Sequence, residues 1–359
     1  MSNKKTKNYR PLYLLLSFLS IFGLFVFVLT CKSDLQIAKN ELPNCKNIEE
    51  VRLCWTKHEN KLSQNEDFEN AVREKLNQLT VSDSQLVKIN DWLPKPPTYL
   101  NVILVPDLSR RIIDTFNNPA QIKNDTTLLN TVWESFVENV KLKSDSKDKL
   151  IVDVTDGTAA VGKFKDIAND LVFDLSTHKD KSNKLYFNKQ GNRFSKNIDS
   201  LYSMSKKKPQ GADYWLYFKD NLSNRVKKNT IHENYRNLVI IITDGYLESE
   251  TKYYTGYLDL HNAICSDIKS GKKIENIFEA RKIKIEPLNL NFSNVEVLML
   301  EVNERKVGIG CHFDILKKYW KDWFVSMQIK VDDNNFFIRR DNAISQVQDK
   351  IRKFIKSKN

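Results

Sequence analysis

Two aspartates directly follow two strongly apolar stretches of the chain. Residues 237–245 read Asn-Leu-Val-Ile-Ile-Ile-Thr-Asp-Gly, and residues 101–107 read Asn-Val-Ile-Leu-Val-Pro-Asp. Each stretch fits a strand buried on both faces, as the central strands of a parallel sheet are. We expect the two strands to be neighbours. Because open α/β sheets bind ligands at the carboxyl ends of their strands, Asp107 and Asp244 are candidate site residues.

Both aspartates have short polar neighbours. Ser109 follows Asp107 by two positions, and Thr243 directly precedes Asp244. Carboxylate and hydroxyl oxygens suit Mg²⁺, which keeps several of its waters and therefore needs few protein ligands. The pattern indicates a weak Mg²⁺ site. The same residues also suit simpler roles, as caps of the turns or helices that follow the strands.

These residues carry a resemblance to a known family. Asp107-Leu108-Ser109 and Thr243-Asp244-Gly245 resemble the Asp-x-Ser-x-Ser and Thr-Asp-Gly motifs of von Willebrand factor type A domains. The resemblance covers about residues 100–356. It implies a doubly wound sheet carrying a metal-ion-dependent adhesion site, in which a partner protein's carboxylate completes the coordination of a divalent cation. The implied function is non-catalytic adhesion or assembly scaffolding.

The sequence departs from the family's motifs at two positions. Arg111 stands where the family has its second serine, and Gly211-Ala212 matches the family's glycine-threonine element without the hydroxyl, with Asp213 beside it. The resemblance therefore implies Asp107, Ser109, Asp244 and Asp213 as metal ligands. The guanidinium of Arg111 would oppose a cation, so we expect it to take over part of the cation's electrostatic role. A plain ion pair between Asp107 and Arg111, leaving the site free of metal, is the alternative.

Two other classes of function stay open. Asp107 and Asp244 could hold Mg²⁺ in a phosphoester hydrolase, although the sequence shows no general base or nucleophile for it. The sequence also lacks the glycine-rich phosphate loops, the nucleophile elbow and the paired zinc-binding histidines of known enzyme classes. The net charge of +12 suggests docking on an anionic envelope polymer or lipid as a third interpretation. Since the lysines are scattered and not interleaved with aromatic residues, we expect no nucleic-acid partner.

The amino terminus indicates export and attachment to a membrane. Residues 12–30 contain no charge and follow a basic segment, as in a membrane anchor or long signal sequence with the remainder of the chain outside the cytoplasm. Val28-Leu29-Thr30-Cys31 resembles the lipobox of bacterial lipoproteins, which makes Cys31 a candidate lipidation site. Four other cysteines would remain, an even number suited to an oxidising compartment. Cys45 and Cys54 are close enough in sequence to pair, and unpaired buried cysteines are the alternative.

Three segments follow from these patterns: a signal or anchor (1–31), a helical region ending in a proline-rich linker (32–98), and an α/β domain (99–359). Alternating strands and helices in the last segment predict a doubly wound, mostly parallel sheet. Asp125 or Thr126 is expected to start the helix after the first strand. Residues 176–211, polar and rich in lysine, are expected to form an insertion on the surface with one short helix at 198–204.

Overall fold

The computed structural model describes residues 33–356, except 114–118, 145, 156–161, 179–181, 210–211, 248–263, 305–310, 335 and 341. The chain divides into two compact units. One unit comprises Met1–Pro97 together with Asn229–Glu233, and the other comprises Thr98–Lys228 and Asn234–Asn359. The predicted anchor and the candidate lipidation site Cys31 lie outside the described residues. Within the described residues, none of the helices has the length and apolar character needed to span a bilayer.

The amino-terminal unit is helical, as predicted for this region. Its helices are α2 (Asp34–Glu41), η1 (Leu42–Asn44), α3 (Ile48–Leu62), α4 (Glu66–Gln78) and α5 (Asp83–Ile89). Asparagine side chains cap two of them: Asn47 accepts from the Glu50 amide, and Asn65 from the Phe68 amide. The core contains Trp55 stacked on Phe68, with 5.2 Å between their ring centroids. Segment 229–233 joins this core through Ile231.

The second unit is an α/β layer structure around a six-stranded sheet, as predicted. The strand order is β3-β2-β1-β4-β5-β6, and every neighbouring pair is parallel except β2 with β3. The strands are β1 (Thr98–Pro106), β2 (Lys149–Val152), β3 (Val172–Asp174), β4 (Asn234–Ile242), β5 (Val295–Val302) and β6 (Phe337–Arg339). The prediction that the strands ending before Asp107 and Thr243 are neighbours is confirmed, because β1 pairs with β4 from Thr98↔Asn234 to Pro106↔Ile242.

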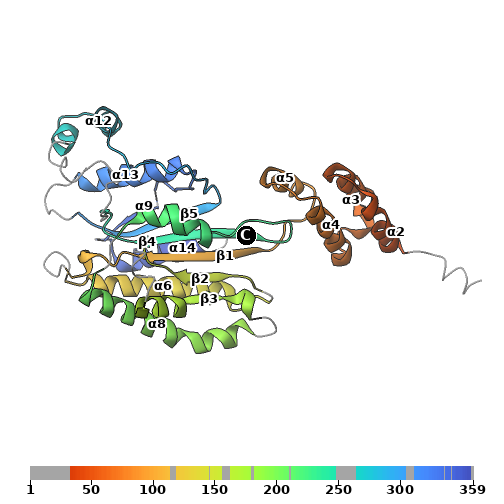
Figure 1. Ribbon diagram of the computed structural model, residues 1–359, viewed down its shortest axis with the longest axis horizontal. Helices are drawn as coiled ribbons and strands as arrows, with labels where there is room; N and C mark the ends of the chain where they lie inside the picture. Colours follow the sequence, from red (N-terminus) through yellow and green to blue (C-terminus); the bar gives the residue numbers. More distant parts are fainter. Residues whose placement is uncertain are drawn as a thin grey trace, which may run out of the picture. The chain divides into compact units, whose positions relative to one another are not determined.

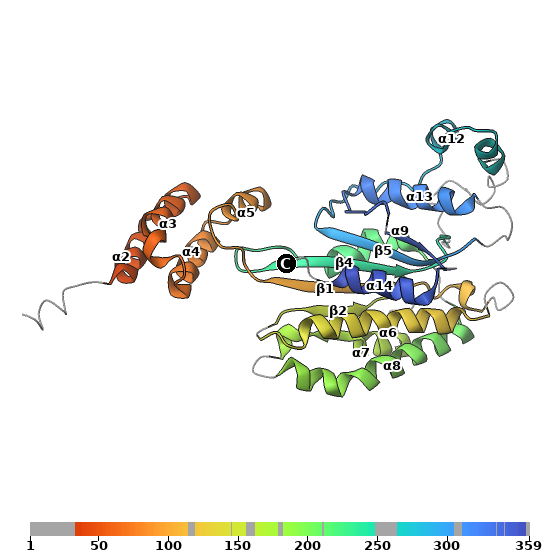
Figure 2. The ribbon, with the colours of Figure 1, turned by 180° about the vertical axis from the view of Figure 1, so that it is seen from behind.

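Helices cover both faces of this sheet (Figures 1 and 2). Alternate side chains of β1 and β4 enter two separate cores, which explains why both strands read as unbroken apolar runs. One core is formed with α9 (Tyr214–Leu216), η5 (Tyr217–Leu222), α12 (Ile274–Arg281) and α13 (His312–Ser326). The opposite core is formed with α6 (Gln121–Val140), α7 (Gly162–Asp170), α8 (Asn183–Lys207) and α14 (Ile344–Ile355). The short elements are η2 (Arg110–Ile112), η4 (Leu175–Thr177) and α10 (Ser223–Arg225).

The prediction of a surface excursion at residues 176–211 is wrong. Most of this range is α8, a helix of 25 residues. Phe187, Phe194, Ile198 and Leu201 are buried in the sheet's core. Phe194 stacks on Trp133 of α6, with 4.7 Å between ring centroids. The helix has one narrow apolar stripe within a broad lysine-rich surface, so its average composition resembles that of a loop.

The Cys45–Cys54 pair considered from the sequence is not formed, and the alternative of unpaired buried cysteines holds for these two residues. Cys45 and Cys54 are both free and buried. The disulfide joins Cys265 to Cys311, which precedes the first residue of α13. This bond closes a loop across a sequence separation of 46 residues and fixes the start of α13.

The role of α8 in the core predicts how two substitutions on it will differ. Phe194 is fully buried, so replacing it with alanine removes ring contacts from the core and leaves a cavity. The free energy of unfolding should fall by about 3–5 kcal/mol. Leu185 lies on the same helix with 64% of its surface exposed, and Leu185→Ala should cost less than about 1 kcal/mol. Urea unfolding of both variants measures the difference. Equal effects would contradict the core role of α8.

Candidate functional site

The carboxyl ends of β1 and β4 bring Asp107 and Thr243 into contact, as their predicted adjacency requires. The Asp107 amide donates to the Ile242 carbonyl at 2.8 Å, which continues the ladder by one residue. The Thr243 hydroxyl donates to Asp107 Oδ2 at 2.7 Å. Both side chains are fully buried. The two motifs therefore meet at one point at the edge of the sheet.

Ser109 also lies in this site, where it shapes the turn after β1. The Ser109 amide donates to Asp107 Oδ1 at 2.9 Å, and the Ser109 hydroxyl accepts from the Arg111 amide at 3.5 Å. Ser109 thus occupies the cap position of η2. The capping role and a position beside Asp107 are compatible, because the two use different atoms of the serine.

Arg111 lies at the centre of the site, with 3% of its side chain exposed. Its Nε is 3.2 Å from Asp107 Oδ2, and its Nη2 is 2.7 Å from Asp125 Oδ2. Nη2 also donates to the Ile242 carbonyl at 3.0 Å. Nη1 is buried and has no hydrogen-bond partner among the described residues. The ion pair between Asp107 and Arg111, one of the two alternatives open from the sequence, is therefore present.

Asp125 is a site residue that the sequence analysis misplaced. Helix α6 begins at Gln121, so Asp125 lies one turn inside the helix instead of at its start. Its Oδ2 also accepts from the Tyr202 hydroxyl of α8 at 3.0 Å, and its Oδ1 accepts from Gln121 at 2.7 Å. One signal was available: Asp125 occupies the same helical stripe as Leu129, Val132 and Phe136, which are buried. A carboxylate in such a stripe requires a buried partner.

The electrostatics of the site follow from burial and mutual attraction. Burial alone would lower the pKa of Arg111, but the Asp125 and Asp107 carboxylates raise it overall and keep the guanidinium charged. Burial raises the pKa of Asp125 despite the opposing effect of Arg111. Glu301, near the end of β5, lies 3.4 Å from Gln121 Nε2. Burial, followed by the nearby Asp125 carboxylate, raises the pKa of Glu301 to about 7.

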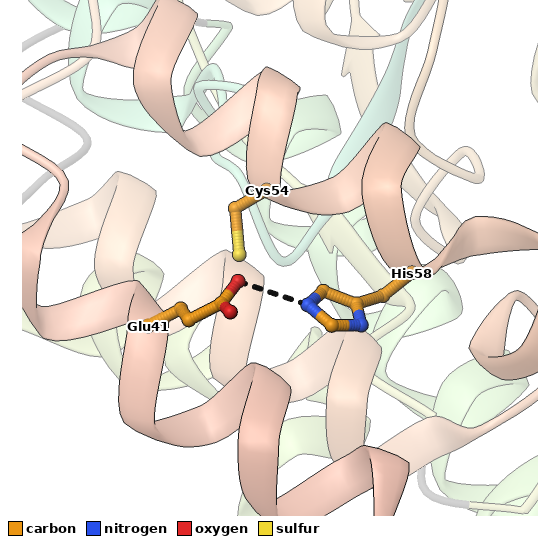
Figure 3. A group of neighbouring side chains, drawn as sticks. All are labelled: Glu41, Cys54 and His58. Atoms are coloured by element: carbon orange, nitrogen blue, oxygen red, sulfur yellow. Dashed lines mark hydrogen bonds and ion pairs between the residues drawn. The ribbon is translucent and has the colours of Figure 1, made fainter.

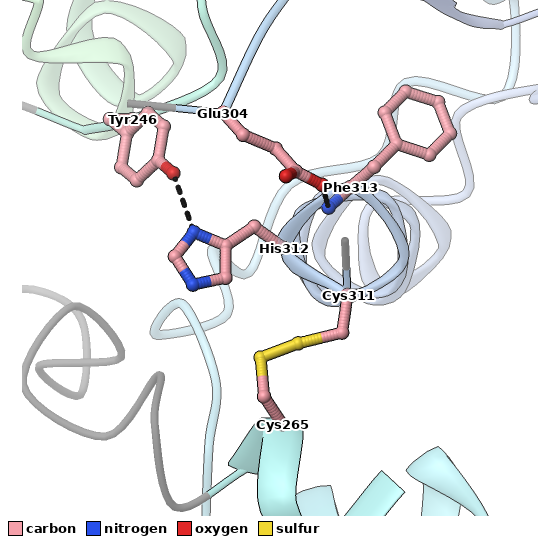
Figure 4. The surroundings of a disulfide bond; sticks show 6 residues. All are labelled: Tyr246, Cys265, Glu304, Cys311, His312 and Phe313. Atoms are coloured by element: carbon pink, nitrogen blue, oxygen red, sulfur yellow. Dashed lines mark hydrogen bonds between the residues drawn. A yellow bond between two sulfur atoms is a disulfide. The ribbon is translucent and has the colours of Figure 1, made fainter. Parts of the chain in front are cut away.

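The loop carrying Asp244 is held by contacts to α13, which covers the face of the sheet opposite to α6 and α8. Asp244 Oδ1 accepts from the Tyr246 amide at 3.1 Å, so Asp244 does form the turn considered from the sequence. Trp320 of α13 donates to the Gly245 carbonyl at 2.8 Å. Gly245 has φ +93°, a conformation that favours glycine. The Tyr246 hydroxyl lies 3.2 Å from His312 Nδ1. Figure 4 shows this pair beside the Cys265–Cys311 disulfide.

Asp213 caps α9 and is half-buried. Its Oδ1 accepts from the Leu216 amide at 2.9 Å. The following residue, Tyr214, is fully buried, and the pKa of its hydroxyl is raised by burial and then by the Asp107 carboxylate. Tyr214 is thus coupled electrostatically to the Asp107 carboxylate. Gly211 lies outside the described residues.

The arrangement forms a cluster of carboxyl groups around one guanidinium. Asp107, Asp125 and Asp244 all act to keep Arg111 charged. A divalent cation bound to Asp107 Oδ2 would share that oxygen with both Arg111 and Thr243. Arg111 and Asp244 each retain 6% of their surface, whereas Asp107 and Asp125 retain none. The outward end of the cluster is therefore formed by Arg111 and Asp244.

Comparisons of the chain with protein-family models and with curated proteins gave no match. The geometry of the cluster is therefore the basis for assigning a role to this site.

The raised pKa of Glu301 predicts a pH dependence of stability. Between its ordinary pKa of 4.5 and about 7, the unfolded chain ionises Glu301 while the folded protein keeps it protonated. The unfolded state then binds fewer protons, so stability falls as pH rises through this interval. The contribution is about 3 kcal/mol, the free energy that corresponds to a pKa raised from 4.5 to about 7.

Glu301→Gln measures this contribution, because glutamine does not ionise. The stability of wild type relative to Glu301→Gln should decline between pH 4.5 and 7.5 and then level off. Urea unfolding at a series of pH values gives the curve. A difference independent of pH would show that Glu301 titrates as an ordinary exposed carboxylate.

Proposed function

We propose that this chain is a non-catalytic binding protein of the von Willebrand factor type A kind, in which Arg111 takes the electrostatic place of the divalent cation. The α/β domain binds a protein partner outside the cytoplasm, and the amino-terminal segment attaches it to a membrane. Its role is adhesion or the assembly of an envelope complex.

Topology and motif placement support this assignment. The motif residues Asp107 and Thr243 follow neighbouring parallel strands and share a hydrogen bond. The sheet has the doubly wound order 3-2-1-4-5-6, whose reversal point lies between β1 and β4. Ligands of such sheets bind where the order reverses, which is where the cluster lies.

The central observation is the buried guanidinium of Arg111 between two carboxylates. Carboxylates gathered in a buried site repel one another and need a positive charge among them. Arg111 supplies that charge at 3.2 Å from Asp107 and 2.7 Å from Asp125. A cation would compete with a charge that is already bonded on both sides. The native protein should therefore bind Mg²⁺ weakly and recognise its partner without it.

The geometry favours binding over phosphoester hydrolysis. Asp107 and Asp125 are bonded to Arg111 and fully buried, so neither is placed to act as a nucleophile or base on a substrate. Glu301 has a pKa suited to proton transfer, but it is 3% exposed and its carboxylate contacts the Gln121 side chain. Of the three aspartates around Arg111, Asp244 alone keeps part of its surface exposed, 6%, and it is the carboxylate within reach of a partner.

The disulfide supports a location outside the cytoplasm. Structural disulfides persist in oxidising compartments and are rare in the cytosol. Cys265–Cys311 fits the export expected from the basic and apolar amino terminus.

Arg111→Ser should convert the site into one that depends on metal. Without metal, the variant should lose about 3–5 kcal/mol of stability, because Asp107 and Asp125 lose their counter-charge. Mg²⁺ or Mn²⁺ at a hundred times its dissociation constant should restore about 2.7 kcal/mol. Thermal unfolding with EDTA and with each metal measures both effects.

Arg111→Lys is the matched control, since it keeps the positive charge, and its stability should not respond to metal. Asp244→Ala combined with Arg111→Ser should remove the metal response. If the stability of Arg111→Ser does not respond to metal, Arg111 does not replace a cation.

Asp244→Ala should weaken partner binding without unfolding the domain. Asp244 is at the outward end of the cluster and 6% exposed, so its loss changes the surface presented to a partner. The full chain, solubilised in detergent, is used to capture proteins from its own envelope in EDTA, and the retained partner is then quantified with each variant. We expect wild type to retain the partner, and the amount retained by Asp244→Ala to be at least tenfold lower.

Asp213→Ala, which removes the cap bond to the Leu216 amide, is the control and should retain the partner. If Asp244→Ala binds as well as wild type, the binding surface lies elsewhere on the fold.

A further inference from the structure

A second polar cluster lies in the amino-terminal unit, apart from the site of the α/β domain. Glu41 is the last residue of α2, and Cys54 and His58 are four residues apart on α3. Their ligand atoms all lie within 4.8 Å of one another. Figure 3 shows the three side chains pointing toward a common point between the two helices. His58 Nε2 is 3.0 Å from Glu41 Oε2.

We propose that Glu41, Cys54 and His58 bind a single Zn²⁺ ion, with the Cys45 thiol as the fourth ligand. A spacing of four residues places Cys54 and His58 on one face of α3, as a shared ion requires. Thiolate, imidazole and carboxylate together suit Zn²⁺, whereas Mg²⁺ and Ca²⁺ prefer oxygen ligands alone.

Cys45 is assigned as the fourth ligand because its thiol is a neighbour of the Cys54 thiol. Its Sγ lies 3.9 Å from the Glu41 carbonyl, and its thiol is a hydrogen-bonding neighbour of Cys54. Cys45, Cys54 and His58 are each buried, with 7–8% of their surface exposed. Three buried ligands and the half-buried Glu41, whose side chain is 35% exposed, fit a structural zinc site, because a catalytic site keeps one position open.

Lys57 supports the charge balance of the site. Its Nζ is 2.6 Å from Glu41 Oε1, which leaves Oε2 facing His58. Two thiolates and one carboxylate around Zn²⁺ carry a net negative charge, and Lys57 offsets it while orienting the carboxylate. The small unit has a reason to use a metal, since helical units of this size have limited cores and are commonly held by metals or disulfides.

The test uses the full chain in detergent under reducing conditions, with Co²⁺ as the probe. We expect one Co²⁺ per chain, with tetrahedral absorption bands and a thiolate-to-cobalt charge-transfer band, both bleached by one equivalent of Zn²⁺. Cys54→Ser and His58→Ala should abolish tight binding. Glu41→Gln should weaken it at least tenfold.

Two controls separate this site from the rest of the protein. The double variant Cys265→Ser/Cys311→Ser, which lacks the disulfide's sulfurs, should keep the charge-transfer band. Asp244→Ala, in the α/β domain, should keep it too, so the proposed partner site and the zinc site fail independently. Circular dichroism checks that each variant is folded, and wild type itself should show a Zn²⁺-dependent rise in melting temperature that His58→Ala lacks.

The outcomes that would overturn the zinc site are specific. One is wild-type protein with no thiolate band, and another is a band that survives Cys54→Ser. A third is a Cys45–Cys54 disulfide, detected by mass spectrometry in alkylated protein taken from its native compartment.

Discussion

The α/β domain depends on the neutralisation of buried carboxylates by one guanidinium. Asp107 and Asp125 are fully buried, and each is held by Arg111. Burying a lone charge is prohibitive, so these three groups must be assembled together or not at all. The assembly needs β1 and β4 in register, η2 to turn Arg111 inward, and α6 and α8 to supply Asp125 and the Tyr202 hydroxyl. Elements far apart in sequence are thus coupled through one charge.

A metal-ion site and an arginine network answer the same electrostatic demand. In both, carboxylates at adjacent strand ends face a positive charge, and hydroxyl groups such as that of Thr243 orient them. The arginine solution is covalently tethered, so the charge cannot dissociate. It also gives directional hydrogen bonds, as in the contact from Nη2 to the Ile242 carbonyl. The motif therefore suits either solution, and we propose that the residue two positions after Ser109 selects between them.

The sheet was the most predictable part of the fold, and buried polar contacts were the least. Residues 238–242 and 297–300 are unbroken apolar runs, so their pattern reports burial on both faces of the sheet directly. Helix α8 escaped prediction because only a stripe such as Phe187, Phe194 and Ile198 faces the core while lysines dominate the average. In the site, the meeting of Asp107 and Thr243 follows from strand order. The roles of Asp125 and Glu301 do not, because a carboxylate's burial depends on tertiary packing that a linear pattern does not contain.

Stability alone does not account for the ionic cluster. Replacing a buried ion pair with apolar residues of similar volume is commonly neutral or stabilising, so a well-packed apolar edge would hold β1 and β4 at least as well. The cluster also leaves costs in place, because Glu301 keeps a pKa raised to about 7 and Arg111 Nη1 is buried without a partner among the described residues. These costs lie at the sheet edge where open α/β sheets bind ligands, with Arg111 and Asp244 at the outward end, and recognition explains them better than packing does.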